Sequence, residues 1–306
     1  MGKRVLVLGS SCVDVIIRLD HLPVTEENMH PPEQKFQVGG CAYNVANVLG
    51  RGGADTTFVT PVGLQGVFGG FVRPLLEKQP WAKPVFLPEE QNGCCYCLVE
   101  KSGERTFLGI HGAEYSFDPA WMEPYQDQFF DFAYVCGLEV EERWGDSLIG
   151  WLEGANVGRV LYAPCPRGPY IPKERTDRLF ALHPLLHLNE REARELAGKS
   201  DLQEAMGALH QRTGSPLVVT RGAEGALVMD DQGDLHTLPG EPVPHVTDTI
   251  GAGDAHAGAV LLGLCQGLPL PDAAALANRV SAQVVQVTGA TLPDDLLNEV
   301  LETLRQ

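Results

Sequence analysis

The feature that most constrains this chain is a glycine turn leading into a helix of small residues, near its C-terminal end. Residues 248–254 read Asp-Thr-Ile-Gly-Ala-Gly-Asp, and the Ala- and Leu-rich run 255–262 favours a helix that other backbone can approach closely. Gly251 and Gly253 can adopt backbone angles that other residues resist. Such a turn leaves N–H groups free at the start of a helix and points the positive end of the helix dipole outward. The sequence therefore predicts an anion site suited to phosphate.

An aspartate, Asp254, stands at the start of this predicted helix. One explanation is that it complements the helix dipole. A carboxylate beside a phosphate site gains nothing from phosphate binding itself, because the two negative charges repel. It is useful there if it takes a proton from a nucleophile that attacks the phosphate. Asp254 is therefore a candidate general base.

Composition and charge limit the classes of partner. The chain has 306 residues, of which 44% are hydrophobic and 21% are charged, as in a globular protein with a large core. A net charge of −17 argues against nucleic acid as a partner, because phosphate backbones are bound by an excess of Lys and Arg. No secretory signal pattern and no run approaching about 20 apolar residues is present, so we expect no membrane partner and a cytoplasmic location.

The eight cysteines lie mostly in apolar context, and we expect them to be free buried thiols. The run Cys94-Cys95-Tyr96-Cys97 resembles part of a zinc motif, but no second C-x-x-C or nearby His pair would complete four ligands. The sequence therefore does not predict zinc at this run.

Short apolar runs alternate with helical patterns along the whole chain, which predicts an α/β fold with a mainly parallel sheet between helices. The expected strands lie within residues 3–9, 58–63, 132–137, 160–167, 185–189 and 216–229. Asp14 and Glu139 follow two of these strands at the edge where α/β sheets bind ligands. Each can equally be an ordinary turn or surface carboxylate. Residues 94–110 predict a β-hairpin.

Two motifs together suggest a family. The string at 248–254 and an upstream Gly-Gly-x-x-x-Asn-x-Ala string at 39–46 resemble, in content and order, the signatures of the ribokinase-like (PfkB) carbohydrate kinases. The resemblance covers nearly the full length. It implies a three-layer α/β/α sandwich with a mainly parallel central sheet and a small β-sheet lid. The α/β domain would comprise residues 1–14, 38–91 and 112–306, and the lid residues 15–37 and 92–111.

The resemblance also implies an activity, the transfer of the γ-phosphoryl group of ATP to a primary hydroxyl of a sugar or sugar derivative. Asp254 would be the base, helped by the backbone of Gly251, Ala252 and Gly253. The residues implied in acceptor binding are Asp14, Gly39, Gly40, Asn44 and Glu139. Those implied in nucleotide binding are Asn189, Glu192, Thr220, Gly222, Gly225 and Asn278. Arg221 would offer a counter-charge.

Metal ions belong to the same expectation. Asn189 and Glu192 would organise Mg²⁺ and phosphate largely through water, so no direct Mg²⁺ ligand is assigned. The same pair also fits a helix capping box, and both roles can hold together. In many relatives a monovalent cation such as K⁺ is held by the segments that correspond to Asp248, Ile250 and Gly289.

Some stretches depart from the family pattern and leave alternatives open. The turn at 63–70 lacks the usual acidic residues, and Ala163 and Cys165 replace the Asp and Asn of many relatives. One alternative is a nucleoside kinase, for which Tyr96 and Phe107 are candidate stacking residues. Another is a sugar- or nucleotide-binding regulator without turnover. A second copy of the chain can cover the lid as a homodimer.

Overall fold

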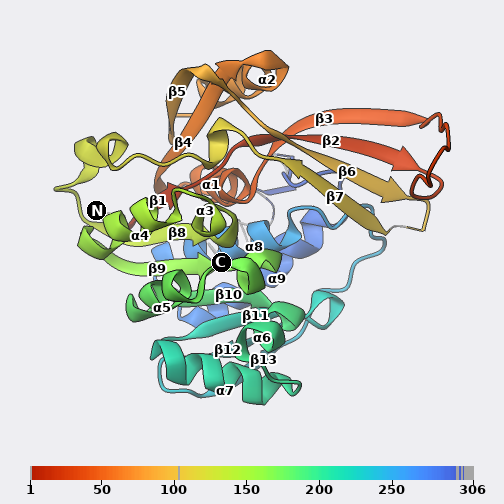
Figure 1. Ribbon diagram of the computed structural model, residues 1–306. Coiled ribbons are helices and arrows are strands. Elements are labelled where there is room, and N and C mark those ends of the chain that lie inside the picture. Colours follow the sequence, from red (N-terminus) through yellow and green to blue (C-terminus); the bar gives the residue numbers. More distant parts are fainter. Residues whose placement is uncertain (1, 103, 294–295, 298, 300–306) are drawn as a thin grey trace.

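The computed structural model describes residues 2–102, 104–293, 296–297 and 299, and in these residues the strands form two sheets (Figure 1). The larger sheet has nine strands in the order β13-β12-β11-β10-β9-β8-β1-β4-β5. Their bounds are β1 Arg4–Leu8, β4 Asp55–Gln65, β5 Ala82–Gln91, β8 Phe130–Cys136, β9 Val157–Ala163, β10 Leu185–Asn189, β11 Leu217–Thr220, β12 Ala226–Met229 and β13 Leu235–Leu238. Neighbouring strands are parallel from β5 across to β11, and β12 and β13 are antiparallel additions.

The central strand β1 shows why these runs are continuously apolar. Val5 and Val7 belong to the core cluster on one face of the sheet, whereas Leu6 and Leu8 belong to the cluster on the other face. A strand that is covered on both faces has no solvent side, so its sequence does not alternate between apolar and polar residues. The predicted buried parallel strands are confirmed.

Helices cover both faces of the large sheet, which confirms the predicted three-layer α/β/α architecture (Figure 1). One face carries α1 Cys41–Arg51, α2 Gly66–Leu76, α8 Ala252–Cys265 and α9 Leu270–Val284. The other carries α3 Gly137–Glu141, α4 Gly145–Gly154, α5 Lys173–Ala181, α6 Glu190–Ala197 and α7 Leu202–Thr213. Four 3₁₀ turns complete the described elements: η1 Ala113–Tyr115, η2 Pro119–Tyr125, η3 Cys165–Tyr170 and η4 Gly222–Glu224. None of the described helices combines the length and the apolar character needed to cross a bilayer.

The smaller sheet extends to one side of the large one and has the order β3-β2-β6-β7 (Figure 1). Its strands are β2 Cys12–Leu19, β3 Glu33–Gly39, β6 Cys94–Glu100 and β7 Arg105–Ile110. The hairpin predicted over 94–110 is confirmed as the antiparallel pair β6–β7. The two middle strands, β2 and β6, are parallel, with Asp14 beside Cys95. Two hairpins that are far apart in the sequence therefore share one sheet.

The loop expected at 63–70 forms no separate turn. Strand β4 continues to Gln65 and α2 begins at Gly66, so the strand leads directly into the helix. The backbone is compact here, because a Cβ on Gly69 would lie 1.8 Å from the Gly63 carbonyl oxygen.

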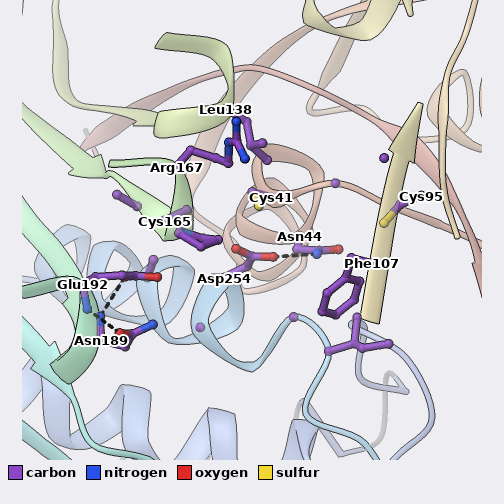
Figure 2. A pocket seen from close by; sticks show the side chains of 18 of the residues that line it. Cys41, Asn44, Cys95, Phe107, Leu138, Cys165, Arg167, Asn189, Glu192 and Asp254 are labelled. Carbon is purple, nitrogen blue, oxygen red and sulfur yellow. Dashed lines mark hydrogen bonds between the residues drawn. The ribbon is translucent and has the colours of Figure 1, made fainter. Parts of the chain in front are cut away.

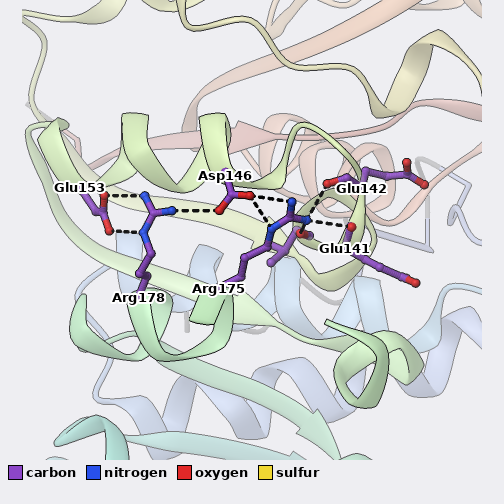
Figure 3. Close-up of polar contacts among 7 residues, drawn as sticks. Glu141, Glu142, Asp146, Glu153, Arg175 and Arg178 are labelled. Atoms are coloured by element: carbon purple, nitrogen blue, oxygen red, sulfur yellow. Dashed lines mark hydrogen bonds and ion pairs between the residues drawn. The ribbon is translucent and has the colours of Figure 1, made fainter. Parts of the chain in front are cut away.

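A network of charged groups joins α3, α4 and α5 beside the carboxyl edge of the sheet (Figure 3). Arg175 donates through Nη1 to the backbone carbonyls of residues 140, 141 and 142, at 2.7–2.9 Å, and through Nη2 to Asp146 at 2.7 Å. Arg178 links Asp146 to Glu153. Helix α3 has only one turn, so its last carbonyls have no intrahelical donors, and the guanidinium of Arg175 satisfies them. This contact fixes the segment that follows β8.

Helices α1 and α8 pack closely because α8 is made of small residues. A Cβ on Gly258 would lie 3.0 Å from the Val45 carbonyl oxygen and 3.0 Å from Val48 Cβ, closer than ordinary van der Waals contact. This confirms the expectation that the Ala- and Gly-rich helix lets other backbone approach. The contact matters for the site, because Asn44 lies on α1 and Asp254 lies on α8.

We expect the substitution Gly258→Ala to lower the free energy of unfolding by about 1–3 kcal/mol, because the added methyl group forces the two helices apart. Gly207→Ala is the matched control. Gly207 also lies inside a helix, α7, but its Cβ would meet nothing within 4 Å, so alanine should raise stability by about 0.5–1 kcal/mol. Urea unfolding of both variants measures the difference. Equal stabilities would contradict the close contact.

Candidate active site

A cavity of about 1530 Å³ lies between the carboxyl edge of the large sheet and the small sheet. It collects residues from widely separated parts of the sequence (Figure 2). The predicted site residues that line it are Asp14, Gly40, Asn44, Asn189, Glu192, Thr220, Ile250, Gly251, Gly253 and Asp254. Most of the residues singled out from sequence thus share one cavity.

The glycine turn opens helix α8 in the way that its sequence predicts. Gly251 is the N-cap with φ +71°, a left-handed conformation that favours glycine, and its missing Cβ leaves room for Ala290, whose Cβ would otherwise lie 2.2 Å away. Ala252 is the first helical residue. The N–H groups of Gly253 and Asp254 fall in the first turn, where a helix offers them no acceptor. The turn is therefore equipped to bind an anion.

Asp254 is paired with Asn44, and this pair lies on the cavity wall (Figure 2). Asn44 Nδ2 donates to Asp254 Oδ2 at 2.8 Å. Asn44 is 4% exposed, and its Oδ1 has no hydrogen-bond partner among the described residues. Burial raises the pKa of Asp254 well above its usual value, and Cys41 beside it raises it further, whereas the hydrogen bond from Asn44 lowers it. A carboxylate whose pKa is raised binds a proton more readily than an exposed one, which suits a general base.

Asp14 lies in strand β2 of the small sheet, at the cavity. Its carboxylate packs directly on Gly39, where a Cβ would lie 2.0 Å from Asp14 Oδ2, so the predicted Gly39 makes room for Asp14. Gly40 follows with φ +103° as the N-cap of α1. Burial raises the pKa of Asp14 to about 7, opposed by its cross-strand neighbour Gln37 and assisted by the charge of Asp248.

This shift predicts a pH-dependent stability. Because the pKa of Asp14 rises from 3.8 to about 7 on folding, the folded state binds its proton more tightly. Asp14 therefore contributes stability fully below about pH 4, and this contribution is lost as the pH rises to about 7. We expect Asp14→Asn to be more stable than the unsubstituted protein at pH 7.5, by about 1–4 kcal/mol, with the difference shrinking toward pH 4. Urea unfolding at several pH values measures it, and a pH-independent difference would contradict it.

Glu139, a predicted acceptor-binding residue, lies outside the cavity lining. Glu139 is buried under the end of β1, where its carboxylate accepts hydrogen bonds from Ser10 N at 2.8 Å and from Cys136 Sγ at 2.7 Å. A Cβ on Gly9 would lie 2.6 Å from Glu139 Oε1, so the carboxylate fills the space that this glycine leaves. These contacts make Glu139 a positioning residue for the turn after β1.

Asn278, a predicted nucleotide-binding residue that also lies outside the lining, is part of a buried hydrogen-bond chain. Its Nδ2 donates to the Pro239 carbonyl at 3.0 Å, so its Oδ1 is the acceptor for His256 Nε2 at 3.1 Å. His256 Nδ1 then accepts from His187 Nε2 at 2.9 Å, and His187 lines the cavity. Burial lowers the pKa of His256 to about 4, and that of His187 falls as well, so both rings are neutral. The chain links the cavity to the 239–240 segment.

Asn189 and Glu192 form the capping box that their spacing predicts. Asn189 Oδ1 accepts from Glu192 N at 2.8 Å, and Glu192 Oε2 accepts from Asn189 N at 2.9 Å, which caps α6 (Figure 2). Both residues also line the cavity, and burial raises the pKa of Glu192. Their oxygen donors are of the kind that Mg²⁺ prefers. The pair therefore fits the predicted role of organising the ion largely through water.

The predicted nucleotide-binding stretch surrounds η4. Thr220 lines the cavity, and Gly222, with φ +58°, has open space where a Cβ would point. Gly225, with φ +88°, instead packs tightly on the neighbouring segment, where a Cβ would lie 2.2 Å from the Leu238 carbonyl oxygen. Arg221, expected as a counter-charge, is paired with Glu224 and, at 3.7 Å, with Glu190.

The expected cation segment is held together by the carboxylate of Asp248. Its Oδ1 accepts from Ile250 N at 2.9 Å and its Oδ2 accepts from Gly289 N at 3.1 Å. Arg105 of β7 adds an ion pair at 3.1 Å and a hydrogen bond to Thr249. Because a guanidinium already neutralises this carboxylate, Asp248 does not fit a K⁺ ligand through its side chain, and only backbone carbonyls of the segment are left for one.

Some residues of the site carry no signal in the sequence. Arg105 reads as an ordinary hairpin residue, yet it joins the small sheet to the glycine turn. Cys41 and Cys165 line the cavity, and Cys41 lies beside Asp254. Their proximity depends on how the strands are ordered in the sheet, which no local pattern reveals.

The chain belongs to the pfkB family of carbohydrate kinases, which residues 3–296 match. It is 34% identical over 289 residues to the protein described as uncharacterized sugar kinase YegV of Escherichia coli K12, covering 92% of this chain and 88% of that protein. It is 26% identical to the ribokinase of Staphylococcus aureus strain COL, over 98% of this chain and 99% of that enzyme.

Solved structures agree on the fold. The Arabidopsis thaliana ribokinase, solved in complex with ribose and ATP, superposes with a TM-score of 0.80 at 18% identity, covering 99% of both chains. The predicted ribokinase-like fold is thus confirmed.

Proposed function

We propose that this protein is an ATP-dependent kinase that transfers the γ-phosphoryl group to a primary hydroxyl of a sugar or sugar derivative, with Asp254 as the general base. The observation that carries the proposal is the Asn44–Asp254 pair on the wall of a cavity that also holds the glycine turn. One end of this arrangement can accept a proton, and the other can stabilise the charge of a phosphoryl group. Membership of the carbohydrate kinase family supports the same chemistry.

The proposed step is an in-line displacement. The acceptor hydroxyl gives its proton to Asp254 while its oxygen forms a bond to the γ-phosphorus. The bond between the γ-phosphorus and the bridging oxygen breaks, and ADP leaves with that electron pair. The backbone N–H groups of Gly253 and Asp254 face the negative charge on the transferring group. Asp14 and the free Oδ1 of Asn44 accept hydrogen bonds from acceptor hydroxyls.

The nucleotide occupies the part of the cavity toward Asn189, Glu192 and Thr220 in this proposal. Mg²⁺ would supply positive charge that neutralises part of the charge of the phosphates. Glu192 and Asn189 would hold it, largely through water. Gly222 leaves open space for a phosphate or ribose to approach the backbone.

We expect Asp254→Asn to lower kcat by about 10²–10⁴-fold, because the amide cannot take the proton. The folded state should persist, since the amide oxygen can still accept from Asn44. Asp201→Asn, at the exposed N-cap of α7, is the control and should keep full activity. ATP consumption across a panel of sugars, sugar acids and nucleosides measures both. Full turnover by Asp254→Asn would overturn the proposed role.

The pH dependence of the same reaction is a second test of Asp254 as the general base. Because burial raises the pKa of Asp254, part of the enzyme carries a protonated, inactive base at low pH. We therefore expect kcat/KM to rise with pH as Asp254 loses its proton, and to be flat in Asp254→Asn. A residual rate in the variant with the same pH profile would assign the titration to another group.

We propose that the small sheet is a lid over the acceptor, which would exclude water and so limit ATP hydrolysis. The small sheet is joined to the segment of the glycine turn by the ion pair between Arg105 and Asp248, whose side chains are only 16% and 4% exposed. Phe107, two residues further along β7, lines the cavity.

Arg105→Gln should raise the KM for the acceptor by about tenfold, corresponding to about 1.4 kcal/mol of lost lid closure. Arg159→Gln removes an exposed ion pair, with Asp231, and should leave KM unchanged. Steady-state kinetics with varied acceptor at saturating ATP measures both. An unchanged acceptor KM in Arg105→Gln would separate this ion pair from acceptor binding.

Phe107 supports a nucleoside as the alternative acceptor. It is 54% exposed at the cavity and offers a face on which a base can stack. Tyr96, the other stacking candidate, packs instead against the core. Phe107→Ala should weaken a nucleoside acceptor and leave a simple sugar almost unaffected. The acceptor panel with this variant distinguishes the two classes.

Two further parts of the proposal concern assembly and location. Phe36, Leu108 and Ile110 on the small sheet are 46–57% exposed, and we propose that a second copy of the chain covers them in a homodimer. Sedimentation of the protein with Leu108→Lys would test this. All eight cysteines are free thiols, and the enzyme would consume ATP, so we propose a cytoplasmic location.

A further inference from the structure

Three cysteines from separate elements converge at the cavity, which Cys41 and Cys165 line and beside which Cys136 is fully buried. Cys41 is the first residue of α1, Cys136 the last of β8, and Cys165 the first of η3. Their three Sγ atoms all lie within 4.8 Å of one another. Figure 2 shows Cys41 and Cys165 in the same pocket as Asp254. The three are unrelated in sequence, so only the sheet order brings them together.

The separation of the sulfur atoms is close to that required by a metal ion. A Zn–S bond of about 2.3 Å places three sulfur ligands about 3.8–4.0 Å apart. The distances between the three Sγ atoms need to shorten by less than about 1 Å to reach this geometry. Three thiols suit soft or borderline d¹⁰ cations, and Mg²⁺ prefers oxygen ligands.

The backbone around the three cysteines is already fixed by other contacts. Cys136 pairs with Ala163 across β8 and β9, and the α3 segment that follows Cys136 is held by Arg175 (Figure 3). Cys165 has φ +56°, a conformation unusual for a side-chain-bearing residue, and this turn carries its thiol to the other two. Little conformational entropy would be lost when an ion binds.

A helix dipole acts on one of the three sulfur atoms. Cys41 stands in the first turn of an 11-residue helix, where the dipole stabilises a negative charge. Each thiol that binds an ion would release its proton to solvent.

We propose that Cys41, Cys136 and Cys165 form a binding site for a thiophilic d¹⁰ cation of the Zn²⁺ class. Cys41 lies on α1 one turn before Asn44, the partner of Asp254, so the fourth ligand position would lie beside Asp254 on the same cavity wall. An ion bound there engages the base and stops the reaction. The site itself stands on geometry alone, whereas this inhibitory consequence rests on the proposed function.

The first experiment measures binding without reference to activity. Cd²⁺ alone is titrated into the reduced full-length protein, and thiolate-to-Cd²⁺ charge-transfer absorption is followed in the ultraviolet. We expect saturation at one equivalent, and at least about 100-fold weaker binding in Cys165→Ser. Absence of the band in the native protein would overturn the proposal and leave these thiols as packing groups.

The chain contains a matched control. Asp14, Cys95 and Cys97 form a second group with ligand atoms within 4.8 Å of one another, on β2 and β6. The double variant Cys95→Ser, Cys97→Ser should keep the band. If this variant loses the band and Cys165→Ser keeps it, the ion binds beside Asp14 and the proposal is wrong.

A second measurement needs no variant and so does not depend on how the substitutions fold. Zn²⁺ should slow alkylation of Cys41 and Cys165 by iodoacetamide, mapped by peptide mass spectrometry, and leave Cys265 unchanged. Equal alkylation of Cys41 and Cys165 with and without Zn²⁺ would overturn the site.

Kinase assays then separate the two proposals. Zn²⁺ should inhibit the native enzyme, reversibly on addition of a zinc-selective chelator, and should act at least about 100-fold more weakly on Cys165→Ser. A Cd²⁺ band in a protein without kinase activity would uphold the metal site and remove the proposed function. Binding without inhibition would uphold the site and overturn its effect on Asp254.

Discussion

The hydrogen bond from Asn44 to Asp254 joins the beginning of the chain to its end, and the geometry of the cavity depends on it. It forms only because α1 and α8 approach closely, and they do so because Gly258 has no side chain at the contact. One backbone constraint in the core thus determines where a carboxylate meets an amide at the surface of the cavity. The helix pair that packs through Gly258 is therefore also the pair that carries Asn44 and Asp254.

The sequence was sufficient for the architecture and for much of the site, because both depend on local signals. Buried parallel strands are continuously apolar, the turn before α8 requires left-handed glycine, and the Asn189–Glu192 spacing marks a helix start. Such signals lie within a few residues of one another. They predicted the elements, and together with the family resemblance they named ten of the residues that line the cavity.

Contacts between elements that are distant in the sequence could not be predicted from such local signals. Glu139 looked like a ligand for an acceptor, but the space left by Gly9 draws its carboxylate beneath β1. Arg105 gave no sign that it reaches Asp248, more than a hundred residues away. Side-chain direction depends on strand order and on the volume of neighbouring residues, and neither can be read from one segment.

The strand order of the small sheet has a consequence for how the molecule assembles. Because β2 and β6 pair in parallel, Asp14 gains its neighbour Cys95 only after the intervening α1, β4, α2 and β5 have been placed. Such non-local pairing carries a large loop-closure cost and is slow to form. Each hairpin can form early on its own, but the surface that would hold the acceptor is completed late. During synthesis all four strands of the small sheet emerge before Asp254, so the acceptor site is complete only once α8 has been made.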